Sequence, residues 1–209
     1  MRTLSDNASV LLDKGRLADA RGNLQRIASL TDRLGGLTRQ LKVFAHKSPR
    51  PTRRVALRKV VQDALLVVDT RLRELGVSVT ADIEPDGLSA QADGARLEQV
   101  LVNLFGNAAD AMAGADERRL RVGATWDGER IRVVIADSGS GIDPQVLPQL
   151  FEPFVTTKPA GKGLGLGLMI SAHIVREFGG RLSARNLEPC GAEFAIGLPT
   201  ASHASGAQP

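Results

Sequence analysis

The sequence predicts an α+β fold in which a two-layer α/β sandwich follows an antiparallel helical hairpin. Three observations lead to this fold class. In residues 1–47, apolar side chains recur at spacings of three and four without a strand pattern, as in amphipathic helices. Pro49 and Pro51 then end the helical pattern, because proline cannot continue a helix. From residue 54 onward, helical periodicity is mixed with the alternation typical of strands, and such mixtures form two packed layers.

The N-terminal segment is expected to form two helices joined by a turn. Leu4 and Ala8 belong to a short amphipathic helix, and Gly15 can take the positive φ of a helix C-cap. A longer helix follows, up to about Lys47. Since one hairpin cannot bury the apolar seam of that helix, a second copy of the chain is expected to complete a four-helix homodimer. The seam consists of Leu17, Ala20, Leu24, Ile27, Thr31, Leu34, Thr38, Leu41 and Ala45.

Each element of the α/β region has its own signal. Gly76 and the pair Gly179–Gly180 stop two helices, and Asp127–Gly128 marks a tight turn between two strands. The expected strands are 55–57, 77–83, 120–126, 131–136, 182–186 and 193–198, and the expected helices are 58–75, 93–112 and 164–178. The chain is therefore expected to divide into a hairpin (1–47), a linker (48–53), an α/β domain (54–199) and a disordered tail (200–209).

Composition excludes several functional classes. The net charge of +4 is scattered, and its densest stretch, from Lys47 to Arg54, contains two prolines and is interpreted as a solvated linker. Aromatic residues make up only 3% of the chain, so few side chains can stack on bases, and no nucleic-acid partner is expected. The single cysteine, Cys190, cannot form an intramolecular disulfide. No apolar run is long enough to span a bilayer, so any membrane attachment is expected outside this chain.

The predicted helix 93–112 carries the first candidate site. Asn103, Asn107 and Asp110 are spaced i, i+4 and i+7 and therefore share one face. Carboxamide oxygens can coordinate Mg²⁺ without adding negative charge beside phosphates. For this helix alone, a solvent-exposed polar face is an equally good interpretation.

Two loops carry the next candidates. Asp137 ends a predicted strand and precedes Gly139 and Gly141, so its carboxylate can accept a hydrogen bond from the exocyclic amine of a closely approaching ligand. Taken alone, this segment is an ordinary glycine turn. Further on, Phe151 and Phe154 come shortly before Lys158, a pattern that also fits a loop fixed to the core by its phenylalanines.

A glycine-rich segment, Gly161–Leu168, leads into the last predicted helix. Glycines at a helix start expose backbone N–H groups and the positive end of the helix dipole to phosphate. The segment lacks the Gly-Lys-Ser/Thr of a P-loop, so by itself it is weak support for a nucleotide site.

Together, these four segments resemble, in order, the N, G1, F and G2 boxes of the histidine kinase ATPase domain, within the superfamily shared with gyrase, Hsp90 and MutL. The resemblance covers about residues 53–199. It implies the Bergerat fold, with ATP bound between helices under a mobile lid at about residues 144–162.

The resemblance also implies roles for individual residues. Asn107 is then the principal Mg²⁺ ligand, and Asn103 assists near the phosphates. Asp137 binds the adenine amine, and Lys158 contacts the γ-phosphate, so that Asn103, Asn107 and Lys158 form the catalytic set. The remaining positions around ATP are Asp110, Gly139, Gly141, Ile142, Phe151, Phe154, Thr156, Thr157, Gly163, Leu164, Gly165, Gly167 and Leu168.

One position separates kinases from hydrolases in this superfamily. ATP hydrolases such as gyrase and MutL typically have a glutamate, which activates water, where this chain has Asn103. An asparagine cannot act as a general base. The resemblance therefore favours transfer of the γ-phosphate to an external nucleophile.

The hairpin resembles the dimerisation and phosphotransfer domain of the same kinases. In the family, the phosphoacceptor histidine lies upstream of a segment like Arg2–Ala8, so the chain is expected to be a fragment with a truncated hairpin and no acceptor. None of His46, His173 and His203 has the acidic neighbour of the family motif, and the chain is not expected to label itself.

Segments 15–24 and 39–45 are most similar to C4-dicarboxylate sensor kinases of the nitrogen-regulation type. This similarity implies an NtrC-like response regulator as partner. It also implies a parent protein in the inner membrane, with this chain at its cytoplasmic end.

Three other functions remain open on the sequence. An ATP-hydrolysing module of the same fold would turn over ATP without a histidine acceptor. An anti-sigma serine kinase shares the nucleotide boxes but normally lacks the long hairpin. A non-catalytic dimerisation module with a vestigial pocket would not bind ATP.

Overall fold

The fold is taken from a computed structural model, which describes residues 2–25, 27, 52–158 and 165–200. Contacts divide the chain into two compact units, residues 1–48 and 49–209, and each unit is described by itself. None of the helices in the described ranges is both long and apolar enough to cross a membrane.

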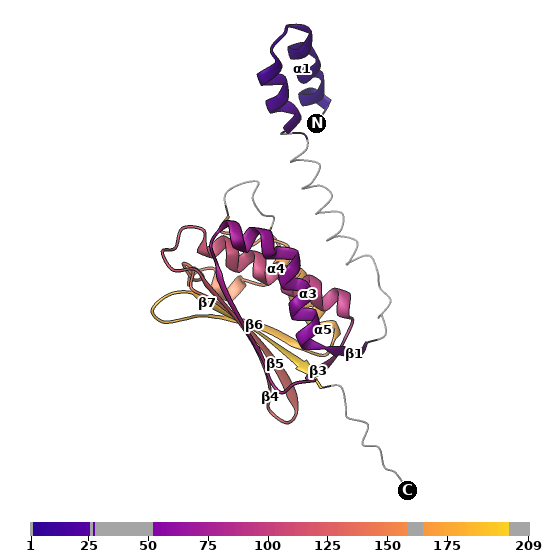
Figure 1. Cartoon of the computed structure of the whole chain (residues 1–209), viewed down its shortest axis with the longest axis vertical. Helices are drawn as coiled ribbons and strands as arrows, with labels where there is room; N and C mark the ends of the chain where they lie inside the picture. The colour runs from indigo at the N-terminus through magenta and orange to yellow at the C-terminus, as the bar shows by residue number, and fades with distance from the viewer. Residues whose placement is uncertain (1, 26, 28–51, 159–164, 201–209) are drawn as a thin grey trace. The chain divides into compact units, whose positions relative to one another are not determined.

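The first unit begins with α1 (Arg2–Asp13), followed by a turn and a second helical stretch from residue 17 to 25 (Figure 1). Gly15 has a φ of 70°, and the Arg16 N–H donates to the Leu11 carbonyl at 2.8 Å, so the predicted turn is confirmed. Leu17 and Leu24 are 68% and 51% exposed in this unit. The seam positions beyond Ile27 and the linker up to residue 51 lie outside the described residues.

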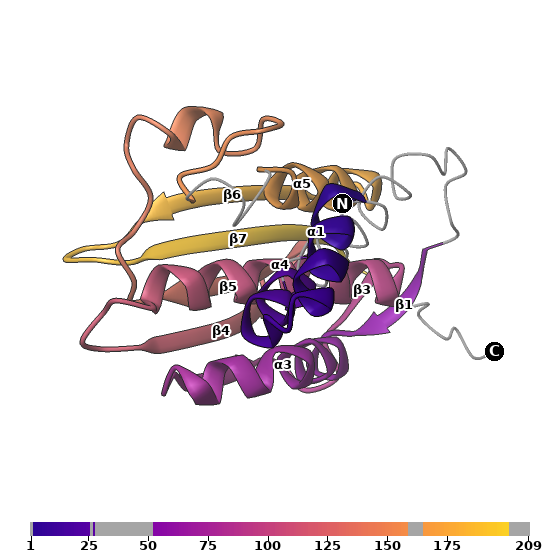
Figure 2. The same ribbon diagram turned by 90° about the horizontal axis from the view of Figure 1, so that it is seen from above.

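The second unit is built on a five-stranded sheet in the order β2-β4-β5-β7-β6 (Figures 1 and 2). β2 and β4 pair in parallel, and all other neighbours are antiparallel. A separate antiparallel pair joins β1 to β3. The strands are β1 (Arg53–Ala56), β2 (Ser78–Ile83), β3 (Ser89–Ala92), β4 (Arg119–Trp126), β5 (Arg130–Asp137), β6 (Arg181–Asn186) and β7 (Ala192–Pro199).

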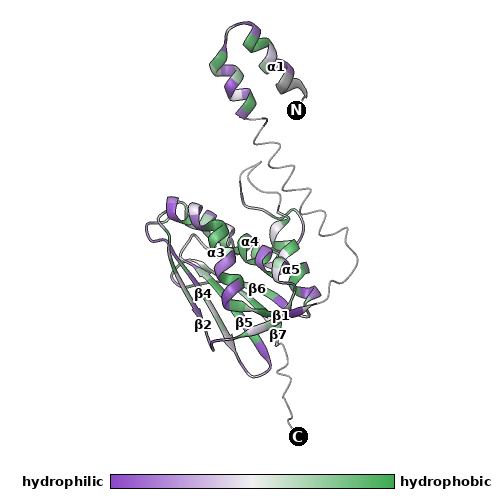
Figure 3. Ribbon diagram, turned by 45° about the vertical axis from the view of Figure 1, so that its right-hand side comes forward, coloured by the Kyte–Doolittle hydropathy of each residue, from purple (hydrophilic) through white to green (hydrophobic). Residues whose placement is uncertain are grey.

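Three helices cover one face of this sheet, so the predicted two-layer sandwich is confirmed (Figures 2 and 3). α3 contacts β2, α4 contacts β5, and α5 contacts β6, while α4 also packs against both other helices. Their bounds are α3 (Leu57–Glu74), α4 (Gly94–Met112) and α5 (Gly167–Glu177); a short 3₁₀ turn, η1 (Leu147–Gln149), lies between α4 and α5 in the chain.

α4 is the central helix of that layer. Asp93 caps it by accepting the Arg96 N–H at 3.2 Å, which satisfies one of the free N–H groups of the first turn. Its buried side chains fix the rotation of the helix about its axis, because turning the helix would expose them to water. They are Leu97, Val100, Leu101, Leu104, Phe105, Ala108, Ala109 and Met112.

Apart from η1 and small shifts at several element ends, the observed elements differ from the predicted ones in three places. The first strand ends at Ala56, and Leu57 already begins α3 with its side chain buried. The last helix begins at Gly167, directly after Gly165, which has a φ of 68°. β3 was not predicted, because its buried positions carry only the small side chains of Ala90 and Ala92 and give little hydrophobic alternation.

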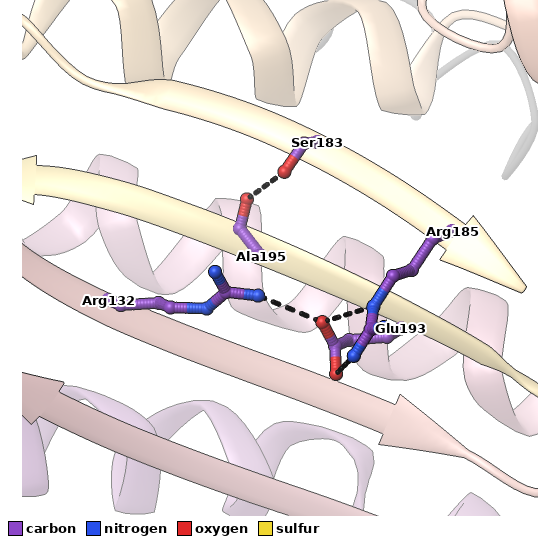
Figure 4. A network of polar contacts seen from close by, with 5 residues as sticks. All are labelled: Arg132, Ser183, Arg185, Glu193 and Ala195. Atoms are coloured by element: carbon purple, nitrogen blue, oxygen red, sulfur yellow. Dashed lines mark hydrogen bonds and ion pairs between the residues drawn. The ribbon is translucent and has the colours of Figure 1, made fainter. Parts of the chain in front are cut away.

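The face of the sheet away from the helices carries a cluster of charges (Figure 4). Glu193 on β7 accepts hydrogen bonds from Arg185 Nε and Nη2, both at 2.9 Å, and from Arg132 Nη2 at 3.0 Å. The side chain of Glu193 is only 11% exposed. The hydrogen bonds and positive charge of Arg185, with those of Arg132, lower the pKa of the Glu193 carboxyl, although its burial acts in the opposite direction. These side-chain pairs add to the backbone pairing of three neighbouring strands, β5, β7 and β6.

We expect Glu193→Gln to lower the free energy of unfolding by about 1–2 kcal/mol at neutral pH, since it removes charge-assisted hydrogen bonds from a buried acceptor. Because the folded-state pKa is lowered, the contribution of Glu193 is present above the ordinary value of 4.5 and is lost as the pH falls below it. Urea unfolding at pH 7 and in acid measures both effects. Glu129→Gln, at the exposed β4–β5 turn, is the matched control. Equal stability of the two variants at pH 7 would contradict the expectation.

Candidate active site

The side chain of Asn103, on α4, faces α5. Asn103 Nδ2 donates to Ser171 Oγ at 3.0 Å, and Ser171 is buried in α5. This bond fixes the carboxamide of Asn103 and directs its oxygen away from Ser171. A Cβ on Gly167, the first residue of α5, would lie 2.5 Å from Asn103 Oδ1, so the start of α5 directly meets this side chain. The N-terminus of a helix attracts anions.

Asn107 and Asp110 share a bound cation, the ammonium group of Lys158. Lys158 Nζ lies 2.9 Å from Asn107 Oδ1 and 2.6 Å from Asp110 Oδ2. Arg71, on α3, contacts the other oxygen of Asp110 through Nη2. The carboxylate of Asp110 therefore lies between two positive charges. These oxygens already accommodate a positive charge, and hard oxygen ligands of this kind are those that Mg²⁺ prefers.

Asp137 is the buried carboxylate at the end of β5. Its Oδ1 accepts the N–H of Gly139 at 2.9 Å and that of Ala192 at 3.4 Å. Burial raises the pKa of this carboxyl, and the two N–H donors lower it in part. In the described part of the chain, no hydrogen bond to Asp137 Oδ2 is formed, so this oxygen is available to a ligand donor.

The glycines after Asp137 allow two backbones to meet. A Cβ on Gly139 would lie 2.7 Å from the carbonyl carbon and oxygen of Ala111 on α4, which leaves no room for a side chain. Gly141 has a φ of 75°. The next residue, Ile142, donates its N–H to Asn186 Oδ1 and accepts from Asn186 Nδ2, both at 2.7 Å. The loop is thus fixed against α4 on one side and β6 on the other.

The segment before α5 brings two predicted motifs together. Thr156 Oγ1 accepts the N–H of Lys158 at 3.1 Å. A Cβ on Gly165 would collide with the backbone of Val155, so the phenylalanine segment and the glycine-rich segment pack closely. Phe151 is half-buried, whereas Phe154 is 72% exposed and has a φ of 66°, an unusual conformation for a residue with a side chain.

The other predicted positions are distributed around this cluster. Leu168 is half-buried in the first turn of α5, and Thr157 is exposed. Gly163 and Leu164 lie outside the described residues, as does the part of the predicted lid from residue 159.

A cavity of about 1100 Å³ adjoins the Asp137 end of the site. Asp137, Gly139 and Ala111 line it, together with loop residues 114–117 and 187–190. Asn103, Asn107 and Lys158 do not line it, so the cavity is separate from the cation cluster.

Three further residues contact the predicted site residues but were not predicted from the sequence: Arg71, Ser171 and Asn186. Each contacts a predicted residue that is at least 39 positions away in the chain. Ser171 had a weak signal, since it lies one helical turn beyond Gly167 and faces the same side of α5. Arg71 and Asn186 had none, because their roles depend on how α3 and β6 are placed.

Comparison with known proteins gives consistent results. A family model described as "Histidine kinase-, DNA gyrase B-, and HSP90-like ATPase" matches residues 92–202. The C4-dicarboxylate transport sensor protein DctB of Pseudomonas aeruginosa is 42% identical over 187 residues, which are 89% of this chain and 31% of that protein. DctB of Rhizobium meliloti is 37% identical over 201 residues, 96% of this chain and 32% of that protein. The chain thus spans about a third of the length of these relatives.

Solved structures agree in fold. The catalytic domain of the histidine kinase ThkA superposes with a TM-score of 0.65 at 26% identity, over 72% of this chain and 99% of that one. Full-length ShkA, solved in complex with AMPPNP, superposes with a TM-score of 0.73 at 25% identity, over 88% of this chain and 39% of that one.

We expect Asp137 to titrate above its ordinary value of 3.8 and Asp127 below it. Burial raises the pKa of Asp137, whereas the N–H groups of Arg130 and Glu129 lower that of Asp127. Since the folded-state pKa of Asp137 is raised, its ionisation costs stability as the pH rises from 3.8 through the folded-state value. Asp137→Asn should therefore gain stability relative to the parent over this range. Carboxyl ¹³C NMR titration measures both groups, and an Asp137 midpoint at or below that of Asp127 would contradict the assignment.

Proposed function

Because the chain belongs to the histidine kinase-, DNA gyrase B- and HSP90-like ATPase family, we propose that it is the catalytic module of a two-component sensor histidine kinase. In this proposal it binds Mg-ATP and transfers the γ-phosphoryl group to an imidazole nitrogen of a histidine, releasing ADP. The single observation that carries the proposal is the cluster of Asn103, Asn107 and Lys158 beside the N-terminus of α5.

The adenine end of the nucleotide belongs at Asp137. Its free Oδ2 can accept a hydrogen bond from the exocyclic amine of adenine, while Oδ1 is held by Gly139 and Ala192. Gly139 and Gly141 shape the wall beside it, since side chains at these positions would meet Ala111 and Asn186. Ile142 continues this wall, and its backbone is held by two hydrogen bonds with the side chain of Asn186.

The phosphates belong between α4 and the start of α5. Asn107 supplies a neutral oxygen for Mg²⁺, Asn103 assists, and the N–H groups near Gly165 and Gly167 face the phosphates. Bound Mg²⁺ supplies positive charge that neutralises the phosphates and polarises the transferred group. Lys158 now rests on Asn107 and Asp110, and its ammonium group can move to the γ-phosphate when the nucleotide enters.

Transfer to a histidine is favoured over hydrolysis because Asn103 cannot act as a general base. Its amide donates to Ser171, and a carboxamide has no basic lone pair with which to activate water. The nearby carboxylate of Asp110 is already paired with Arg71 and Lys158.

Two kinds of partner accompany this function. Leu17 and Leu24, both well exposed on the described hairpin, support a homodimer formed through its helices. By resemblance to the DctB sensors, an NtrC-like response regulator receives the phosphoryl group. The same resemblance supports a position at the cytoplasmic end of an inner-membrane sensor.

Calorimetric titration of ADP with Mg²⁺ tests the pocket. We expect binding by the parent and roughly tenfold weaker binding by Asn107→Asp, because the new negative charge lies beside the phosphates and Asp110. Asn7→Asp, on the exposed surface of α1, makes the same chemical change in the other unit and should bind like the parent. A folded parent that does not bind ADP would favour the non-catalytic dimerisation module.

Transfer from γ-labelled ATP to a separately supplied, histidine-containing helical hairpin tests the reaction. We expect acid-labile label on that hairpin and none on this chain, since none of its histidines is followed by an acidic residue. Acid-labile phosphate on the chain itself would contradict this expectation. Steady ATP turnover without an acceptor would favour the hydrolase instead.

A further inference from the structure

The carboxylate of Asp110 contacts two positively charged side chains, so positive charges outnumber negative ones around it. One carboxylate faces two cations, with Arg71 Nη2 on Oδ1 and Lys158 Nζ on Oδ2 at 2.6 Å. Lys158 also contacts Asn107 Oδ1 at 2.9 Å, and its side chain is about two-thirds buried. The cluster of Arg71, Asp110 and Lys158 therefore has a net positive charge, directly beside the proposed phosphate site.

The position of Lys158 has a consequence for binding. Its ammonium group donates to the same oxygen of Asn107 that the proposed function assigns to Mg²⁺, and two cations at that oxygen would repel each other. We therefore expect Lys158 to leave Asn107 when Mg-nucleotide enters. Asp110 would then be an unpaired carboxylate facing the phosphates, unless another cation compensates it.

Arg71 can supply that compensation without moving. It belongs to the last turn of α3, a different element from the segment that carries Lys158. Its Nη1 lies close to Gly106 of α4, where a Cβ would be in ordinary van der Waals contact with it at 4.0 Å. A guanidinium also offers several donors in one plane, which suits a carboxylate that must be held in one orientation.

We propose that Arg71 is a positioning residue of the nucleotide site. It holds and neutralises Asp110, so that Asp110 retains Lys158 while the site is empty of phosphate and releases Lys158 to the phosphates when Mg-nucleotide binds. This inference rests on the proposed function and adds to it a charge exchange at the metal and phosphate end.

A simpler interpretation makes Arg71–Asp110 an ordinary ion pair between two helices. Half-exposed pairs of this kind contribute little to stability. The two interpretations differ in what they predict for phosphate-bearing ligands compared with adenosine, and in whether the effect of Arg71 depends on the charge of Asp110.

The test measures dissociation constants of Mg-ADP and of adenosine by calorimetry. Arg71→Gln should weaken Mg-ADP binding by about tenfold, within the range of couplings measured in charge networks, and leave adenosine binding unchanged. Arg71→Lys, which keeps the charge, should recover most of the affinity. Arg73→Gln is the matched control, since Arg73 lies on the same helix and pairs with the exposed Asp69 at 2.9 Å.

A double-mutant cycle with Asp110→Asn separates positioning from direct contact. In the Asp110→Asn background, Arg71→Gln should change Mg-ADP affinity less than about twofold, because no carboxylate is left to neutralise. An equally large loss in both backgrounds would mean that Arg71 touches the phosphates itself, and would overturn the positioning role. The Asp110→Asn pair also replaces the single variant if Arg71→Gln does not fold, which thermal unfolding reveals.

The remaining outcomes are distinct. If the parent binds Mg-ADP and Arg71→Gln behaves like Arg73→Gln, this inference fails and the proposed function stands. Equal losses for adenosine and Mg-ADP would indicate a general structural effect and also overturn it. If the parent binds neither ligand, the proposed function fails, and this inference with it.

Discussion

The rotation of α4 about its axis is the constraint on which the site depends. Eight buried side chains hold the apolar face of α4 against the sheet and its neighbouring helices. With that face fixed, Asn103 is directed toward α5, while Asn107 and Asp110 face Lys158. Asp110 also reaches Arg71 on α3. The hydrophobic layer therefore does more than stabilise the fold. It determines which oxygens are offered to a ligand.

Close contacts at two glycines fix the rest of the site relative to α4. Gly139 lies against the Ala111 carbonyl, and Gly167 lies against the side chain of Asn103. Both ends of the proposed ligand site are therefore positioned by contacts with α4. A side chain at either glycine would push its element away from the helix. Asp137 and the start of α5 thus keep a set spacing.

Periodicity predicted most of the fold, because α4 and the strands β4 and β5 each bury one face and expose the other. It failed at β3, where Ala90 and Ala92 are too small to mark a buried face. The four motifs named Asn107, Asp110 and Lys158, whose side chains are in contact in the structure. The contacts of the motifs with Arg71, Ser171 and Asn186 could not be predicted, since each joins elements that are remote in the chain and depends on packing angles. The contacts of Lys158 with Asn107 and Asp110 could likewise not be predicted from the sequence.

The central claim is that Asn103 and Asn107, on α4, lie at the metal end of a nucleotide site. Paramagnetic broadening of asparagine side-chain amide NMR signals, with Mn²⁺ and ADP replacing Mg²⁺ and ATP, tests it most directly. The account predicts that the Asn107 signal broadens first and most strongly as Mn²⁺ is added, followed by that of Asn103, and that both remain sharper when ADP is omitted. Strongest broadening at Asn186, or an Asn107 signal unaffected by saturating Mn-ADP, would contradict the account.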